Sequence, residues 1–114
     1  MDTEKSCDTY IDVDDALKRI GGNMDLYKRL LKRFVEGNHY EALVSDLQGG
    51  KMEDATRQAH TLKGVSANLS FNVLRAISAD VERMLIEGSD YSQRLVELKN
   101  AYDATLEQIS QLLS

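Results

Sequence analysis

The stretch AHTLKGVSANL, residues 59–69, brings together residue types that suit group-transfer chemistry. His60 supplies an imidazole, Lys63 an ammonium group three residues later, and Gly64 leaves space beside them. An exposed imidazole is largely neutral near neutral pH, and a neutral imidazole can accept a phosphoryl group and pass it on as a good leaving group. A fixed cation nearby stabilises the charge of that phosphoryl group. The pattern therefore indicates phosphoryl transfer through His60, supported by the charge of Lys63.

Helical spacing predicts that these residues lie on an exposed face. Residues advance about 100° around an α-helix, and positions 55, 59, 62, 66 and 69 form a stripe that faces the core. A second stripe lies roughly 130° away and contains Thr56, His60, Lys63, Gly64 and Ala67. A glycine inside a helix costs about 0.5–1 kcal/mol relative to alanine, so its expected benefit here is room for another molecule. We therefore expect a docking surface at Thr56, Arg57, Gly64 and Ala67.

The motifs of a nucleotide-activating enzyme do not occur in the sequence. There is no Gly-rich phosphate loop, no strand-turn-helix nucleotide motif and no acidic pair suited to holding magnesium beside His60. We therefore expect a phosphoryl carrier without its own ATP site or bound cofactor, rather than an enzyme. Donor and acceptor would be supplied by partner proteins.

Five amphipathic segments must position these residues. The spacing predicts a short helix over about 13–20, capped by Asp12, and a longer helix from Asn23 to about Gln48. Gly37 weakens the middle of the second segment, so a bend is expected at EGNH, residues 36–39. Three further helices are predicted over about 51–69, 71–87 and 89–113, with Ser89 as the cap of the last.

Each segment carries one apolar stripe, and no segment alternates with the period of a strand. Short linkers between long amphipathic helices favour antiparallel neighbours. The predicted fold is therefore all-α: an antiparallel up-and-down four-helix bundle with a short additional N-terminal helix. We expect one domain over residues 10–114, preceded by a flexible segment over residues 1–9.

Composition narrows the class of protein. The chain has 114 residues and a formal net charge of −5, which argues against a general nucleic-acid binder. Cys7 is the only cysteine, so neither an internal disulfide nor a cysteine-based zinc site is expected. No stretch approaches a membrane span, and the polar start does not resemble a signal peptide. These features favour a cytoplasmic protein.

The stretch AHTLKGVSANL resembles the signature of histidine-containing phosphotransfer (Hpt) domains, the relay modules of two-component signalling pathways. IDVDDALKRIGGNMDLYKRLLKRF is similar to the opening helices of that family, and LRAISADVERML to the helix after the motif. The resemblance covers about residues 10–114. It implies that His60 accepts a phosphoryl group, that Lys63 supports it and that Gly64 gives clearance to a receiver domain. It also implies a monomeric relay whose partners are receiver domains or a hybrid histidine kinase, with magnesium held by the receiver.

Two positions depart from the family pattern. Glycine is frequent where this chain has Ser70, which we expect to cap the following helix. The phosphorylated domain of chemotaxis-type kinases often has a histidine where this chain has Ala79, and Glu82 matches the carboxylate that orients the imidazole there. The resemblance thus implies an orienting role for Glu82 and favours a relay over a chemotaxis-kinase domain. That domain and a non-phosphorylated helical adaptor are the alternative functions.

Each assignment has a simpler alternative. His60 and Lys63 could be ordinary surface residues, Gly64 a tolerated defect, and Glu82 a plain surface acid. The basic group Lys28, Arg29, Lys32 and Arg33 is either a solvated helix face or a guide for an acidic partner. His39 completes the Glu-x-x-His spacing of di-iron bundles, but two histidines in the chain cannot supply the repeated motif that such a site needs. No metal site is therefore expected.

Overall fold

The computed structural model describes residues 10–114, and all regular secondary structure in this range is helical. The helices are α2 (Val13–Arg19), α3 (Met24–Glu36), α4 (His39–Gln48), α5 (Met52–Leu69), α6 (Asn72–Glu87) and α7 (Ser92–Leu113). The prediction of an all-α fold is confirmed for these residues. The predicted flexible segment over residues 1–9 lies outside them. Within the described range, no helix has the length and apolar character needed to cross a bilayer.

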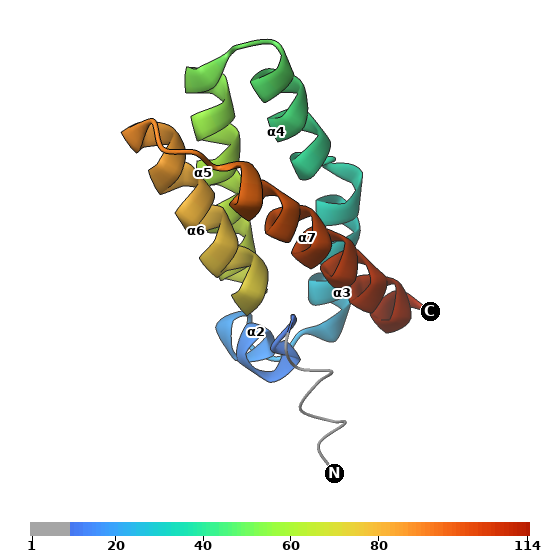
Figure 1. The fold of residues 1–114 in the computed structure, drawn as a ribbon. Helices are drawn as coiled ribbons and strands as arrows, with labels where there is room; N and C mark the ends of the chain where they lie inside the picture. Colours follow the sequence, from blue (N-terminus) through green and yellow to red (C-terminus); the bar gives the residue numbers. More distant parts are fainter. Residues whose placement is uncertain (1–9) are drawn as a thin grey trace.

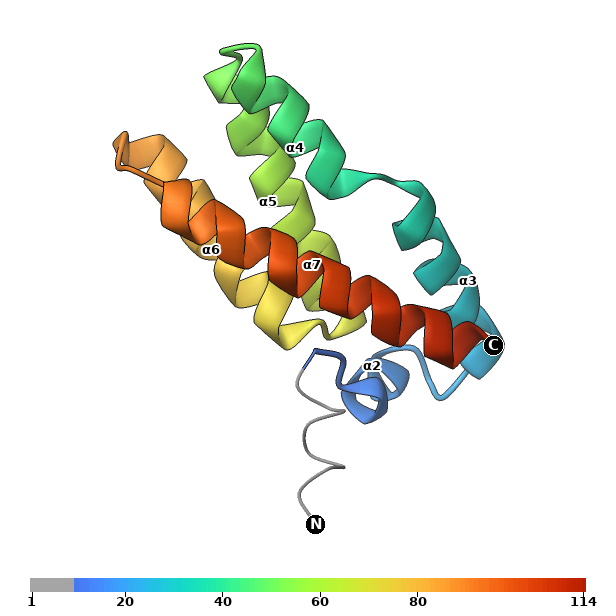
Figure 2. The same cartoon turned by 45° about the vertical axis from the view of Figure 1, so that its right-hand side comes forward.

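The helices α4, α5, α6 and α7 run in alternating directions, and α3 runs in the same general direction as α4 (Figures 1 and 2). α3 and α4 follow one another along one edge, α5 returns beside α4, and α6 runs back against α5. α7 then returns alongside α6 toward α3, and α2 lies across the end of the helices near the turn between α5 and α6. The α5–α6 pair is the most extensively packed pair of helices, and it carries the residues of the predicted site.

The core lies between the apolar faces of these helices. Its largest fully buried side chains are Ile11, Tyr27, Leu31, Leu43, Leu62, Phe71, Leu74, Val81, Leu98, Tyr102, Thr105 and Ile109. Four of the five positions in the predicted core stripe of α5 are completely inaccessible to solvent, and Leu69 is 6 % exposed. The hydroxyl of Tyr27 donates a 2.9 Å hydrogen bond to the carbonyl oxygen of Leu69, which joins α3 to the end of α5.

The prediction of one helix from Asn23 to Gln48 is wrong, because the segment is divided into α3 and α4. α3 ends at Glu36 with Gly37 as its C-cap, and Asn38 takes a left-handed conformation with φ of 51°. Asparagine tolerates this conformation better than most residues, and it is incompatible with a continuous helix. The expected bend at residues 36–39 is therefore a complete break.

The predicted helix caps are partly confirmed. Asp12 accepts a hydrogen bond from the backbone N–H of Asp15, and Asn23 accepts one from the backbone N–H of Leu26, both at 3.0 Å. The prediction for Ser89 is wrong: α7 begins at Ser92, and Asp90 accepts the bond from its N–H. Asp90 is one residue nearer to Ser92 in the sequence than Ser89 is, and a carboxylate is a stronger acceptor than a hydroxyl.

Ser70 does not cap α6 as predicted. It ends α5 in a left-handed conformation with φ of 62°, and no side chain caps the start of α6. Its hydroxyl donates a 2.7 Å hydrogen bond to Asp15, and its carbonyl oxygen accepts one from the N–H of Asp12. Ser70 therefore attaches α2 to the α5–α6 turn, at a position whose backbone conformation glycine adopts more readily.

Candidate functional site

His60 projects from the middle of α5 on the side opposite the buried stripe. Its side chain is 67 % exposed, whereas Ala59 and Leu62 on the core side are completely buried. The helix thus fixes the backbone of His60 through a packed face while leaving the imidazole accessible. A partner can reach the ring without unfolding or displacing any element.

Glu82, on α6, holds one nitrogen of the imidazole. Its Oε2 lies 2.8 Å from Nδ1 of His60. A carboxylate only accepts hydrogen bonds, so this contact assigns the proton of the neutral ring to Nδ1. The lone pair of the neutral ring is then on Nε2, which is the nitrogen available for nucleophilic chemistry.

Lys63 binds the other oxygen of the same carboxylate. Its Nζ lies 2.7 Å from Oε1 of Glu82, and the Lys63 side chain is 35 % exposed. Glu82 itself is only 15 % exposed and lines a shallow hollow with Lys63 and Ala79. The three side chains make one connected unit: His60, Glu82 and Lys63.

The charge of Glu82 is stabilised by both neighbours. The hydrogen bond from Lys63, and to a smaller extent that from His60, hold the pKa of Glu82 below its usual value against the opposing effect of partial burial. Glu82 is therefore ionised near neutral pH. An ionised acceptor orients the imidazole and stabilises positive charge on it.

Gly64 leaves open space one turn beyond His60. A Cβ atom built at Gly64 meets no heavy atom within 4 Å outside its own chain neighbours and the nearby helix backbone. No contact within the described chain therefore requires glycine at this position. Ala67 follows at helical spacing and is only partly buried, so the surface beside the imidazole remains low.

The remaining predicted docking residues lie toward the start of α5. The hydroxyl of Thr56 donates a 2.9 Å hydrogen bond to the carbonyl oxygen of Met52, and Arg57 forms an ion pair with Asp54. Both residues line a shallow hollow with Leu85 and Ile86 of α6. They therefore lie on the N-terminal flank of His60, while Gly64 and Ala67 lie on its C-terminal flank.

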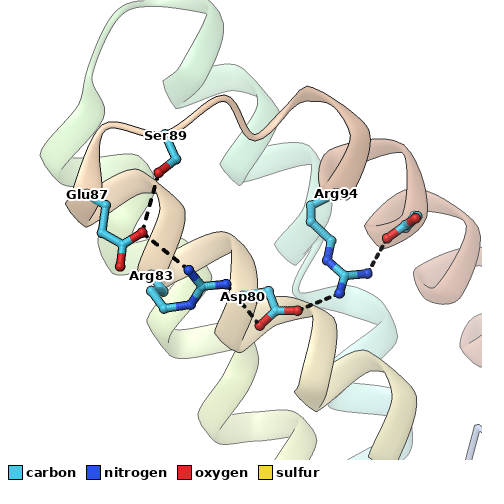
Figure 3. A network of polar contacts seen from close by, with 6 residues as sticks. Asp80, Arg83, Glu87, Ser89 and Arg94 are labelled. Carbon is cyan, nitrogen blue, oxygen red and sulfur yellow. Dashed lines mark hydrogen bonds and ion pairs between the residues drawn. The ribbon is translucent and has the colours of Figure 1, made fainter.

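A polar network fixes the outer face of α6, the helix that carries Glu82 (Figure 3). Asp80 binds Arg94 of α7 at 2.8 Å and Arg83 of its own helix at 3.5 Å. Arg83 also contacts Glu87, which accepts a hydrogen bond from Ser89 in the connection to α7. The contacts across the two helices, together with the buried residues below them, restrain the position of Glu82 relative to α7.

The pairing of Lys63 with Glu82 was not part of the sequence prediction. A signal for it exists, because antiparallel helices joined by a short turn place residues at similar distances from the turn opposite one another. His60 lies ten residues before Ser70 and Glu82 lies eleven after Phe71. This counting brings Glu82 opposite His60 and Lys63, but only once the turn and the antiparallel packing are known.

No grouping of three or more histidine, cysteine or acidic side chains in residues 10–114 has the proximity needed to hold a metal ion. His39 is half-buried rather than part of such a group. Its ring stacks on Phe34 with a centroid distance of 5.1 Å. It therefore contributes to the packing at the start of α4.

Comparison with known proteins identifies one family. The family model described as Hpt domain matches residues 29–112, a range that includes His60, Lys63, Gly64 and Glu82. No curated protein and no solved structure matches the chain.

Proposed function

The chain belongs to the Hpt domain family, and from this premise we propose that it relays phosphoryl groups through a phosphohistidine at His60. Hpt domains are phosphocarrier modules of two-component phosphorelays that interact with receiver domains and histidine kinases. They have no ATP site of their own. The observation that carries the residue assignment is the exposed imidazole of His60, oriented through Nδ1 by Glu82.

The proposed reaction uses the lone pair of Nε2. It attacks the phosphorus of an aspartyl phosphate in a receiver domain, the N–P bond forms, and the P–O bond to the aspartate breaks to release the carboxylate. Nδ1 keeps its proton and its hydrogen bond to Glu82, which offsets the positive charge that develops on the ring. Reversal of these steps on a second receiver aspartate completes the relay.

Lys63 has two partners in this proposal. In the structure it neutralises Glu82, and a phosphoryl group on His60 offers it a second anionic acceptor on the same helix face. Movement of Nζ toward that group places a positive charge beside the phosphoryl oxygens. Magnesium is supplied by the receiver, and this domain binds no cofactor.

The proposed docking surface surrounds His60 on α5. Gly64 and Ala67 give a receiver close access to the imidazole, and Thr56 and Arg57 contact it on the other flank. A basic group on α3 guides the acidic active site of a receiver toward this surface. The group consists of Lys28, Arg29, Lys32 and Arg33.

The proposal includes an arrangement of the helices that is typical of such a relay domain. We assign α3 with α4, α5, α6 and α7 to four antiparallel arms of the bundle, and α2 to the additional N-terminal helix. The protein acts as a monomer, since one copy contains the nucleophile, its orienting carboxylate and the supporting cation. We also propose that it acts in the cytoplasm, as its composition favours.

Incubation with a phosphorylated receiver domain and magnesium tests this function. We expect acid-labile, alkali-stable label on the natural protein and none on a His60→Gln variant that retains its helical content. A Gly64→Trp variant should accept label more slowly with little loss of stability. Equal labelling of the natural protein and His60→Gln would refute the assignment of His60.

The contact between Glu82 and His60 also favours a second candidate function. A carboxylate at this position is the feature that resembles the phosphorylated domain of chemotaxis-type kinases, although Ala79 lacks the histidine often found there. The two functions can be distinguished by the phosphoryl donor that each requires. A phosphorylated receiver labels a relay domain rapidly, whereas the kinase-domain alternative requires an ATP-binding domain acting in trans.

A further inference from the structure

Two exposed apolar side chains line one hollow between the start of α5 and the end of α6. Ile86 is 68 % exposed and Met52 is 42 % exposed, and the hollow that they share has a volume of about 410 Å³. Ile86 is the most exposed large apolar side chain in the range 10–114. Single exposed apolar side chains are common, whereas apolar surface that is gathered in one place marks a site of interaction. We call Met52 and Ile86 the apolar patch.

The apolar patch is continuous with the proposed phosphoryl-transfer site. Ile86 also lines a second hollow, together with Lys63 and Glu82. It follows Glu82 by four residues on α6, and residues with this spacing lie on the same face of a helix, about 6 Å apart along its axis. Ile86 therefore lies one turn from the carboxylate that contacts His60, at the boundary between the two hollows.

Charged side chains border the apolar patch. Arg57 binds Asp54 within α5, and Arg83 binds Glu87 at 3.2 Å within α6 (Figure 3). Each arginine thus has an acidic partner on its own helix. An apolar centre bordered by polar side chains is the usual anatomy of a protein interface. Apolar contact, rather than charge, is therefore the main interaction that this flank of His60 offers to a partner.

A partner that exchanges phosphoryl groups with His60 comes close to this patch. Nε2 has to approach the phosphorus to within reacting distance, so His60 lies inside the contact area. A transient interface of about 600 Å² on each partner corresponds to a disc with a radius of about 14 Å. Ile86 lies one helix turn from Glu82, which itself contacts His60. A disc of that size around His60 therefore includes Ile86.

We propose that Ile86, with Met52, is the apolar anchor by which a receiver domain docks on the α6 side of His60. The inference rests on the proposed relay, because it concerns the partner of the same site. The receiver presents an apolar side chain beside its acidic active site, and burial of the two apolar surfaces favours the complex. Ile86 carries no group that can take part in phosphoryl transfer, so it determines the affinity for the receiver rather than the rate of the chemical step.

Initial rates of transfer at varied concentrations of a phosphorylated receiver domain test the proposal. Ile86→Ala should raise the receiver concentration that gives the half-maximal rate about tenfold, whereas the maximal rate should stay within about twofold of that of the natural protein. Val96→Ala is the matched control, because Val96 is 57 % exposed but belongs to α7 and lines neither hollow. An unchanged half-maximal concentration in Ile86→Ala, an equal change in Val96→Ala, or a loss confined to the maximal rate would overturn the proposal.

Calorimetric titration of His60→Gln with the receiver measures docking without transfer. Adding Ile86→Ala to this variant should weaken receiver binding about tenfold, and adding Ile86→Leu should change it by less than about twofold, because leucine keeps the volume and the apolar character. The loss in Ile86→Ala should be the same at about 50 mM and about 300 mM salt, since salt screens charges rather than apolar contacts. A loss that disappears at the higher salt concentration would overturn the assignment of an apolar anchor.

The results distinguish failure of the anchor from failure of the relay. If the receiver labels the natural protein and Ile86→Ala alike, the relay stands and the anchor is wrong. If the receiver labels neither, the relay fails and the anchor fails with it. If the natural protein self-associates and Ile86→Ala prevents this while labelling is unchanged, the apolar patch is an interface between two copies of the chain, and the proposal is wrong.

Discussion

Glu82 divides its two carboxylate oxygens between the proposed nucleophile and the proposed supporting cation. Oε2 contacts Nδ1 of His60 at 2.8 Å, and Oε1 contacts Nζ of Lys63 at 2.7 Å. The carboxylate therefore sets the tautomer of the imidazole and keeps the ammonium group close to it. At the residue scale, we infer that Glu82 is a positioning residue for phosphoryl transfer.

The substitution Glu82→Gln should slow phosphorylation of His60 by roughly 10- to 100-fold. Hydrogen bonds to charged groups contribute about 1.5–3 kcal/mol, and each 1.4 kcal/mol corresponds to about a tenfold change. The initial rate of transfer from a phosphorylated receiver measures the effect. Glu87→Gln removes the same charge from the same helix and should leave the rate near that of the natural protein. An equal loss of transfer rate in both variants would show that the rate depends only on the total charge of α6, which would contradict the positioning role of Glu82.

His39 should make the stability of the fold depend on mildly acidic pH. Burial lowers the pKa of His39, and Glu41 only partly opposes this effect. The unfolded chain therefore binds a proton at His39 more readily than the folded chain. The free energy of unfolding should consequently decrease as the pH falls below about 6.5, the ordinary value for histidine, toward the lower pKa of the folded state.

Urea unfolding of His39→Phe at pH 7.5 and pH 5.5 measures this contribution. Phenylalanine keeps an aromatic ring against Phe34 but cannot be protonated. The free energy of unfolding should therefore fall less between pH 7.5 and pH 5.5 in His39→Phe than in the natural protein. A pH dependence unchanged in His39→Phe would contradict the assignment.

At the scale of elements, α5 carries a buried stripe and an exposed functional stripe on one rigid helix. Gly64 lies on the exposed stripe, where an added Cβ atom has open space. Glycine at this position therefore lowers helix stability without a packing benefit within the described residues. The open surface that it leaves beside His60 is the feature that we assign to partner docking.

The substitution Gly64→Ala should raise the free energy of unfolding by about 0.5–1 kcal/mol, because alanine restricts the unfolded chain and favours the helix. Thermal or urea unfolding measures this change. Gly37→Ala is the contrasting control and should not stabilise the protein, because its Cβ atom would meet the ring of His39 at 2.7 Å. A destabilised Gly64→Ala would show that the glycine has a structural role.

The same elements show what the sequence allows one to predict. Apolar spacing and local capping predict α2, α5 and α6 and the caps Asp12 and Asn23, because these features depend on neighbours in the chain. The break at Asn38 is not fixed by local propensity, since a non-glycine residue there takes a left-handed conformation within a long amphipathic pattern. The prediction for Ser70 failed because its partner, Asp15, lies 55 residues away in the sequence.

The candidate site also combines features that the sequence predicts with features that depend on how the helices pack. The spacing of His60, Lys63 and Gly64 on one helix predicts their shared face from sequence alone. The distance between His60 and Glu82 depends on the register of α5 against α6, which periodicity does not specify. The resemblance to a known family supplied Glu82, and the structure places it within hydrogen-bond distance of both His60 and Lys63.

At the scale of the whole molecule, the core and the proposed site occupy opposite sides of α5. The core joins elements that are distant in the sequence, as the bond from Tyr27 to Leu69 does across 42 residues. The site residues are more exposed, and their polar contacts join only α5 and α6. Stability and phosphoryl transfer should therefore be separable by substitution.

Tyr27→Phe should destabilise the protein by about 1 kcal/mol, because it removes a buried hydrogen bond and leaves the carbonyl oxygen of Leu69 without that donor. Unfolding should remain a single transition, since the core is continuous from α3 to α7. The rate of phosphorylation at a temperature where the variant is fully folded should stay close to that of the natural protein. A large loss of transfer without a loss of stability would contradict the separation of core and site.

The most direct test of phosphoryl transfer through His60 is to identify the phosphorylated atom. After transfer from a phosphorylated receiver, long-range proton–nitrogen correlations of the histidine rings distinguish a phosphoryl group on Nε2 from one on Nδ1. Because Glu82 occupies Nδ1, we expect a single phosphohistidine, at residue 60, bonded through Nε2. A phosphoryl group on Nδ1 of His60, on His39 or on a residue other than histidine would contradict the proposed mechanism.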